Sequence, residues 1–189
     1  MKKATLIIVA VLSAFFLNLT CSTAAEAARV AVIPIQVNEK KVERSGDFNS
    51  YYLDIMIEKF QYPEYELMED DKVVAEIPEE GLQSYDRNTL VGLAEKLDAE
   101  IIVAMKLDEV YEEPIFNVFE PKVGCYMYGA FASFNRITGK YYFKKIQYRD
   151  RMEEMLTLKN DWQQQVFVSE LKRYINRTLE DNNKKKSKF

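Results

Sequence analysis

The stretch AEIIVAMKLDEVYEE, residues 99–113, decides the fold. Apolar residues alternate along it, and two further apolar residues fill the gaps of its first half: Ile101, Val103, Met105 and Leu107, then Ile102 and Ala104. A strand that is apolar on both sides is typical of a sheet covered by helices on both faces. Its second half alternates with charged residues. We therefore expect a strand that begins in the centre of a sheet and ends in water.

A helix leads directly into this strand. Its apolar residues fall at helical spacing, at Leu90, Leu93, Ala94 and Leu97. Asp86 can cap its amino-terminal end. Further upstream, RVAVIPIQV, residues 29–37, is a nearly continuous apolar run that predicts a second buried strand. Because Pro34 has no N–H to donate, this strand tolerates a missing bond there or ends near it.

The residues between these two strands predict two helices and a short strand. A first helix, capped by Ser45 or Asp47, is indicated by apolar residues at helical spacing: Phe48, Tyr52, Ile55, Met56 and Phe60. Pro63 ends it, and YELMED, residues 65–70, predicts a short strand. Asp70 or Asp71 is a candidate cap for a short helix that follows.

Downstream, two aromatic-rich runs, 123–135 and 140–149, flank NRITGK and predict a hairpin. Gly139 can adopt the positive φ that such a turn often needs. A last amphipathic helix is expected from about Trp162 to Leu179, capped by Asn160 or Asp161. Its apolar side comprises Phe167, Leu171, Tyr174, Ile175 and Leu179.

The expected order is therefore β-α-β-α-α-β-β-β-α, an α/β fold with a mixed sheet and helices packed on it. Alternating strands and helices in the first half imply neighbouring parallel strands, and the last two strands extend the sheet antiparallel. Length and pattern predict a single domain over 28–182 and a basic, disordered tail over 183–189.

The amino terminus predicts export. Lys2 and Lys3 precede a short apolar run, and Ala25-Glu26-Ala27 fits the small-residue rule for cleavage of a signal peptide over 1–27. Lipidation at Cys21 is the alternative, but Asn18 stands where a lipoprotein signal usually has an aliphatic residue. We expect a periplasmic or extracellular protein, anchored to a membrane only if Cys21 is lipidated.

Three segments together resemble a known family: VAVIPI at 30–35, YELMEDDKV at 65–73, and LVGLAEKLDAEIIVAMKLDEV at 90–110. This succession is similar to that of the curli-export lipoprotein family, and the amino-terminal domain of the Tol-system translocation protein has a similar fold. The resemblance implies an α/β fold in a cell-envelope setting and no catalytic residue. Two departures argue against an export channel: the chain lacks a good lipidation motif, and its one hairpin, expected to be short, is needed for the sheet.

The composition excludes several kinds of chemistry. The chain has no histidine, which excludes the usual Ser-His and Cys-His nucleophiles and histidine-containing metal sites. Its glycines form no phosphate-binding loop, and its paired carboxylates lack calcium-loop spacing. The net charge of −4 argues against nucleic-acid binding. We expect no enzyme, cofactor or metal, and a buried Cys125.

Aromatic residues crowd the last three strands, and 123–135 is apolar on both faces. Either helices cover both sides or one face binds a partner. The candidate partner-binding residues are Tyr126, Tyr128, Tyr142, Lys144, Lys145 and Arg149. The basic residues of 140–151 can equally be charged guards that keep a sheet edge from pairing.

We therefore expect a non-enzymatic envelope protein, an assembly or interaction module that binds itself or an acidic envelope protein through 140–151. The alternative is a small-molecule or glycan-binding envelope protein that uses the Tyr-rich strands. A closed pocket lined by Tyr126, Tyr128 and Tyr142 would favour a ligand, and a flat apolar patch would favour a partner.

Overall fold

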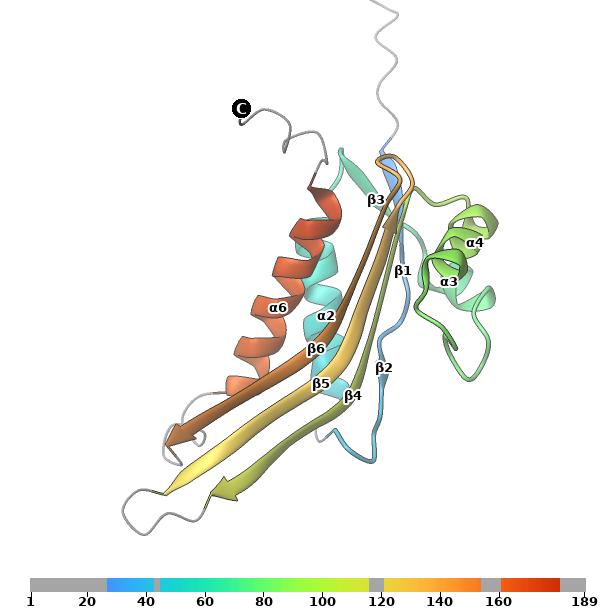
Figure 1. The fold of residues 1–189 in the computed structure, drawn as a ribbon. Coiled ribbons are helices and arrows are strands. Elements are labelled where there is room, and N and C mark those ends of the chain that lie inside the picture. The colour runs from blue at the N-terminus through green and yellow to red at the C-terminus, as the bar shows by residue number, and fades with distance from the viewer. Residues whose placement is uncertain (1–26, 43–44, 116–120, 154–160, 181–189) are drawn as a thin grey trace, which may run out of the picture.

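A computed structural model describes residues 27–42, 45–115, 121–153 and 161–180. The strands form one mixed sheet in the order β3-β1-β4-β5-β6, and β2 pairs with β4 beside this path. The elements follow one another as β1 (Ala28–Val32), β2 (Gln36–Val37), α2 (Ser45–Lys59), β3 (Tyr65–Leu67), α3 (Asp70–Ala75), α4 (Arg87–Leu97), β4 (Ile101–Ile115), β5 (Lys122–Asn135), β6 (Lys140–Glu153) and α6 (Trp162–Leu179). Figure 1 shows helices on both faces of this sheet. The expected α/β fold class is confirmed.

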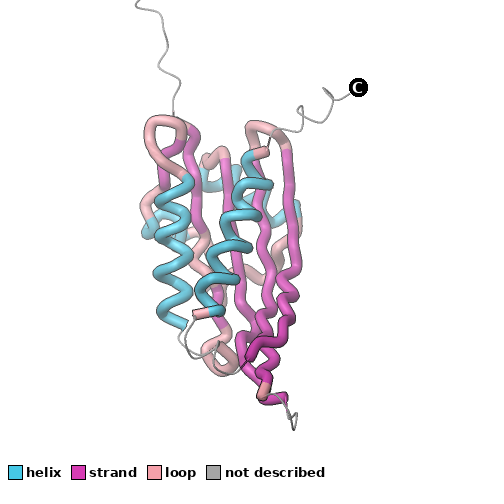
Figure 2. Tube along the Cα trace, turned by 90° about the vertical axis from the view of Figure 1, so that its left-hand side faces the viewer, coloured by secondary structure: helices cyan, strands magenta, loops and turns pink. Residues whose placement is uncertain are grey.

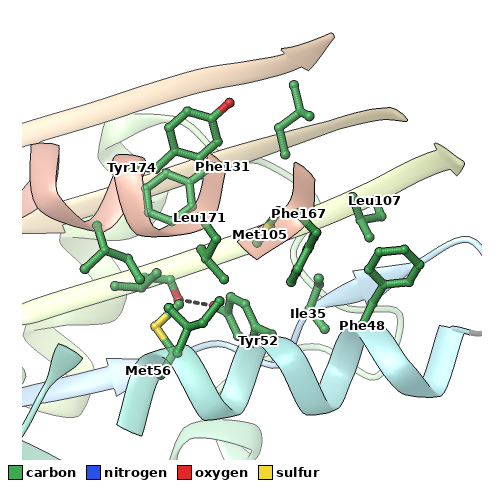
Figure 3. Packing of buried hydrophobic residues seen from close by; sticks show 14 of the residues in the cluster. Ile35, Phe48, Tyr52, Met56, Met105, Leu107, Phe131, Phe167, Leu171 and Tyr174 are labelled. Carbon is green, nitrogen blue, oxygen red and sulfur yellow. Dashed lines mark hydrogen bonds between the residues drawn. The ribbon is translucent and has the colours of Figure 1, made fainter. Parts of the chain in front are cut away.

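The two long helices α2 and α6 lie side by side over one face, which we call the α2/α6 face (Figure 2). Phe48 of α2 packs edge-on against Phe167 of α6, with ring centroids 5.1 Å apart. The hydroxyl of buried Tyr52 donates to the carbonyl oxygen of Ile33, 3.1 Å away, and so ties α2 to the segment after β1. Figure 3 shows Tyr52 among the buried side chains of this face. The helical spacing read from the sequence thus identifies the core side of both helices.

The shorter helices α3 and α4 cover part of the opposite face, the α3/α4 face. Asp86 caps α4 as expected, since its carboxylate accepts from the N–H of Thr89 at 2.9 Å. The expectation for α3 was wrong: Glu69, and neither Asp70 nor Asp71, occupies the cap position, and no side chain caps this helix. Both aspartates lie in the first turn, where negative charge still favours the helix dipole.

The strands of the first half are parallel and the later ones antiparallel, as expected. β1 pairs in parallel with β3 and β4, whereas β4-β5 and β5-β6 are antiparallel. The buried run 29–37 divides at Pro34 into β1 and β2, which adds one short strand to the expected order. Gly139 has φ 65° in the turn of the hairpin.

The hairpin is longer than expected. β5 and β6 have 14 residues each, paired without a break, and β4 has 15. Figure 1 shows these three strands extending past the ends of the helices. The added length lies mainly in β6, which continues through 150–153 past its expected end at 149, whereas β5 matches the expected 123–135 to within one residue.

Residues 1–26 of the predicted signal peptide, with Cys21, and the tail 183–189 lie outside the described residues, so both stay predictions. Within the described part of the chain, no helix is both long enough and apolar enough to span a membrane.

Candidate partner-binding face

None of the described helices covers the α3/α4 face where β4, β5 and β6 extend beyond α4 (Figure 1). Even-numbered residues of β5 and odd-numbered residues of β6 share this side, because Tyr126 is paired with Arg149 and Ala130 with Lys145. Six side chains make up what we call the tyrosine face: Tyr111, Tyr126, Tyr128, Phe143, Lys145 and Arg149. Tyr111 and Phe143 are 40% and 41% exposed, which is high for large apolar rings of a folded domain.

The three tyrosine rings lie nearly parallel. The ring centroids of Tyr111 and Tyr126 are 4.8 Å apart at 19°, and those of Tyr126 and Tyr128 are 6.5 Å apart at 9°. Gly124 makes room for the ring of Tyr126, since a Cβ on Gly124 would lie 2.8 Å from that ring. The strands therefore hold an ordered aromatic surface, which costs little entropy when a partner covers it.

Arg149 fixes one end of this surface. Its Nε donates to the hydroxyl of Tyr128 at 2.9 Å, and its guanidinium carbon lies 5.5 Å from the centroid of the Tyr128 ring. Both contacts orient the guanidinium and leave its charge on the surface.

The charges on the face are unequally neutralised. On β4, Asp108 pairs with Lys106 at 2.9 Å, and Glu109 pairs with Lys41. On β6, by contrast, Lys145 and Arg149 make no ion pair with any carboxylate of the described residues. The outer strand of the face is therefore the basic side of an otherwise acidic molecule.

Two titratable groups of these strands have a raised pKa, Tyr111 and Cys125. Partial burial, and then the neighbouring Tyr128, raise the pKa of Tyr111. On the α2/α6 face, burial first, and then Glu112 and Asp150, raise the pKa of Cys125 to about 11. A thiol with so high a pKa is a poor nucleophile at neutral pH. Among the described residues, no cluster of His, Cys, Asp and Glu is arranged to hold a metal ion.

A groove of 630 Å³ borders the tyrosine face on the side of α4. From the strands it is lined by Tyr128, Gly129, Ala130 and Phe143, among others. The segment 83–86 before α4 also lines it. The groove and the tyrosine face form one continuous surface over β5 and β6.

The structure brings four of the six predicted site residues together and separates the other two. Tyr126, Tyr128, Lys145 and Arg149 share the tyrosine face. Tyr142 packs on the α2/α6 face, where its ring centroid lies 6.2 Å from that of Tyr174. Lys144 pairs with Phe131 and shares its side of the strand. The closed pocket of Tyr126, Tyr128 and Tyr142 that would have favoured a ligand is therefore not formed, because the period of two places Tyr142 on the other face.

Tyr111 and Phe143 were not among the predicted site residues. The register of β4 shifts between Leu107 and Glu109, a bulge that moves later residues to the opposite face. Strict alternation from Leu107 would have placed Tyr111 on the α2/α6 face, whereas it pairs with Tyr126. The signal for Phe143 was available, since it differs from Lys145 by two residues.

Comparisons with known proteins give distant structural matches. No family model matches the chain, and no curated protein matches it. Lipoprotein GNA1162 from Neisseria meningitidis has a TM-score of 0.41 at 12% identity, and the match covers 79% of this chain and 99% of that chain. A Helicobacter pylori protein described as a homologue of a neuraminyllactose-binding hemagglutinin has a TM-score of 0.46 at 14% identity, covering 86% and 90%. A PelC dodecamer from Paraburkholderia phytofirmans has a TM-score of 0.39 at 12% identity, covering 80% and 89%.

These matches are too distant to assign a family or a function to the chain. The resemblance to the curli-export family remains an expectation. The function has to be argued from the tyrosine face itself.

Proposed function

We propose that the protein is an exported, non-enzymatic module of the cell envelope that binds an acidic partner protein through the tyrosine face. The observation that carries the proposal is the composition of this uncovered part of the sheet. Ordered tyrosine rings, an exposed Phe143 and two cations without a carboxylate partner among the described residues lie side by side. Tyr, Phe and Arg are the residue types enriched in the centres of protein interfaces.

The physical basis is burial of aromatic surface combined with charge selection. Each aromatic ring contributes a large apolar area when a partner covers it. Lys145 and Arg149 then select an acidic partner and steer its approach, because complementary charge acts mainly on specificity and association rate. The preformed rings lower the entropic cost of binding.

The non-enzymatic part of the proposal rests on the side chains. The chain has no histidine, and its buried Cys125 carries a pKa raised to about 11 by burial. The carboxylates of the face that could act as a pair, Asp108 and Glu109, each already bind a lysine.

The alternative, a small-molecule or glycan-binding role, has the groove in its favour, since 630 Å³ lies within the size range of ligand sites. The groove brings Tyr128 next to Phe143 but not to Tyr142, which lies on the other face. This arrangement supports a partner surface over a closed ligand pocket. Titration calorimetry with envelope oligosaccharides would reverse this preference if it gave saturable binding that Phe143→Ala abolished.

The test is site-specific crosslinking in the envelope of the cells that make the protein. A photoreactive phenylalanine analogue is placed at Tyr126 or, as a control, at exposed Gln165 on α6. We expect a defined crosslinked protein from position 126 only, and its loss when Tyr111→Ala and Tyr128→Ala are added. Equal crosslinking from Gln165, or none from either position, would exclude the proposal.

A further inference from the structure

The outer edge of β6 is the longest unpaired strand edge among the described residues. β6 is the last strand of the sheet order, and all 14 of its residues pair with β5 on the inner side. The other outer strand, β3, has only three residues. An unpaired edge presents a row of N–H and C=O groups to which an extended chain can add.

The cations on one side of β6 form a row without ion pairs to the described carboxylates. Several other cations of the described structure are paired, as Arg29 is with Asp98 at 2.5 Å and Lys172 is with Glu58 at 2.6 Å. Lys145, Arg149 and Arg151 lie two or four residues apart on one side of β6, and none makes an ion pair with a described carboxylate. Glu153 ends the same row, and the three like charges before it repel one another unless a neighbouring strand supplies acids.

We propose that the partner contributes an extended acidic segment that adds to the edge of β6 as a further strand. This inference rests on the proposed function and names the chemistry of the segment. Main-chain hydrogen bonds supply affinity, and alternate side chains supply specificity. Residues two apart on the added strand face Lys145, Arg149 and Arg151, so the segment carries carboxylates at alternate positions.

The same cations explain why the edge does not pair indiscriminately. Charged residues on an edge strand hinder pairing with apolar or basic strands. An acidic strand instead neutralises these charges. The row of cations therefore disfavours pairing with most strands and favours pairing with acidic ones. The sequence left two interpretations of 140–151 open, a partner-binding segment and charged guards of a sheet edge, and these are therefore compatible.

The probe is a fluorescein-labelled octapeptide that alternates Thr and Glu. Fluorescence anisotropy measures its binding to the protein that begins at Ala28, the expected mature start. We expect saturable binding at low salt and none for the matched peptide alternating Thr and Lys. The double variant Lys145→Glu with Arg149→Glu should weaken binding by at least about tenfold. Lys144→Glu, the matched change on the other face, should alter it by less than about threefold.

Strand addition is separated from simple charge attraction by N-methylation of the peptide. One peptide is methylated at its Thr amides and a second at its Glu amides, with charge unchanged. Because alternate amides of a strand point to the same side, only one of the two should lose binding. Amide exchange should slow at alternate residues of β6 in the complex. Equal affinity of both methylated peptides for the protein would overturn the inference.

The same protein preparation tests two other candidates for the partner that binds the edge of β6. Binding of anionic phosphatidylglycerol vesicles in place of the acidic peptide would overturn the inference in favour of a lipid surface. Sedimentation that shows self-association lost on Lys145→Glu, with no peptide binding, would overturn it in favour of a second copy. If the peptide fails and crosslinking from Tyr126 persists, the inference is wrong while the proposed function stands.

Discussion

Gly129 of β5 lies directly against the carbonyl oxygen of Lys106 in β4, at the bulge of that strand. A Cβ on Gly129 would lie far inside van der Waals contact with this oxygen and 3.2 Å from Cα of Leu107. Because both atoms belong to the backbone, the two strands would have to separate. We expect Gly129→Ala to lower the free energy of unfolding by about 2 kcal/mol or more, measured by urea denaturation.

Gly92→Ala is the matched control. Gly92 lies inside α4, and a Cβ there meets nothing within 4 Å. Alanine should therefore raise the free energy of unfolding by about 0.5–1 kcal/mol through its better helix propensity. Equal effects of the two substitutions would show that the contact between Gly129 and Lys106 does not constrain the strands.

The periodic part of the fold was predictable from the sequence. Apolar spacing identified the core sides of α2, α4 and α6, and the double-sided apolar run 101–105 identified the central strand. These patterns follow from burial and repeat over several turns or residues. The division of the first strand at Pro34 was one of the two outcomes expected from the missing N–H of proline.

The site was only partly predictable, because register is a tertiary property. The period of two in a strand correctly placed Tyr126 and Tyr128 on one face. No local sequence pattern predicts the bulge after Leu107 that brings Tyr111 beside them. The sequence also cannot show where α4 stops covering the sheet. The length of the hairpin was underestimated because charged ends look like loops when their strand partners are unknown.

Gly124 offers a test of the aromatic arrangement that spares the fold. A Cβ at this position would lie 2.8 Å from the ring and hydroxyl of Tyr126, the far end of a flexible side chain. We expect Gly124→Ala to displace the ring while the free energy of unfolding changes by less than about 1 kcal/mol. Near-ultraviolet circular dichroism should change, and crosslinking from Phe143 should fall. Unchanged crosslinking would mean that ring order does not matter for binding.

The raised pKa of Cys125 predicts a loss of stability at alkaline pH. Burial raises its pKa from 9.0 to about 11. The unfolded chain releases this proton from about pH 9, while the folded protein keeps it to about pH 11. The folded state therefore binds more protons in this window, and the free energy of unfolding falls as pH rises through it. Urea denaturation at several pH values measures the slope.

Two variants identify the groups responsible. Cys125→Ala should cost about 1 kcal/mol at neutral pH because it removes a buried sulfur, but flatten the slope between about pH 9 and 10. Burial, and then Asp150, raise the pKa of Tyr148 from 10.0 to about 12, so Tyr148→Phe should leave the slope below about pH 10 unchanged and reduce it only above that pH. A slope between about pH 9 and 10 that survives Cys125→Ala would assign the alkaline loss to other groups.

Lys144 and Lys145 provide the most direct test of the binding face, because they are consecutive, both exposed, and on opposite sides of β6. Lys145→Glu places a negative charge where an acidic partner binds, so the two repel each other. Lys144→Glu changes the net charge by the same amount, but on the other face. We expect Lys145→Glu to reduce crosslinking from Tyr126 severalfold and Lys144→Glu to leave it nearly unchanged. Raising the salt from about 0.01 to 0.1 M shortens the screening length from about 30 to 10 Å and should weaken the wild-type complex more than the Lys145→Glu complex. Equal losses of crosslinking in both variants would indicate a response to net charge and would show that the tyrosine face does not select the partner.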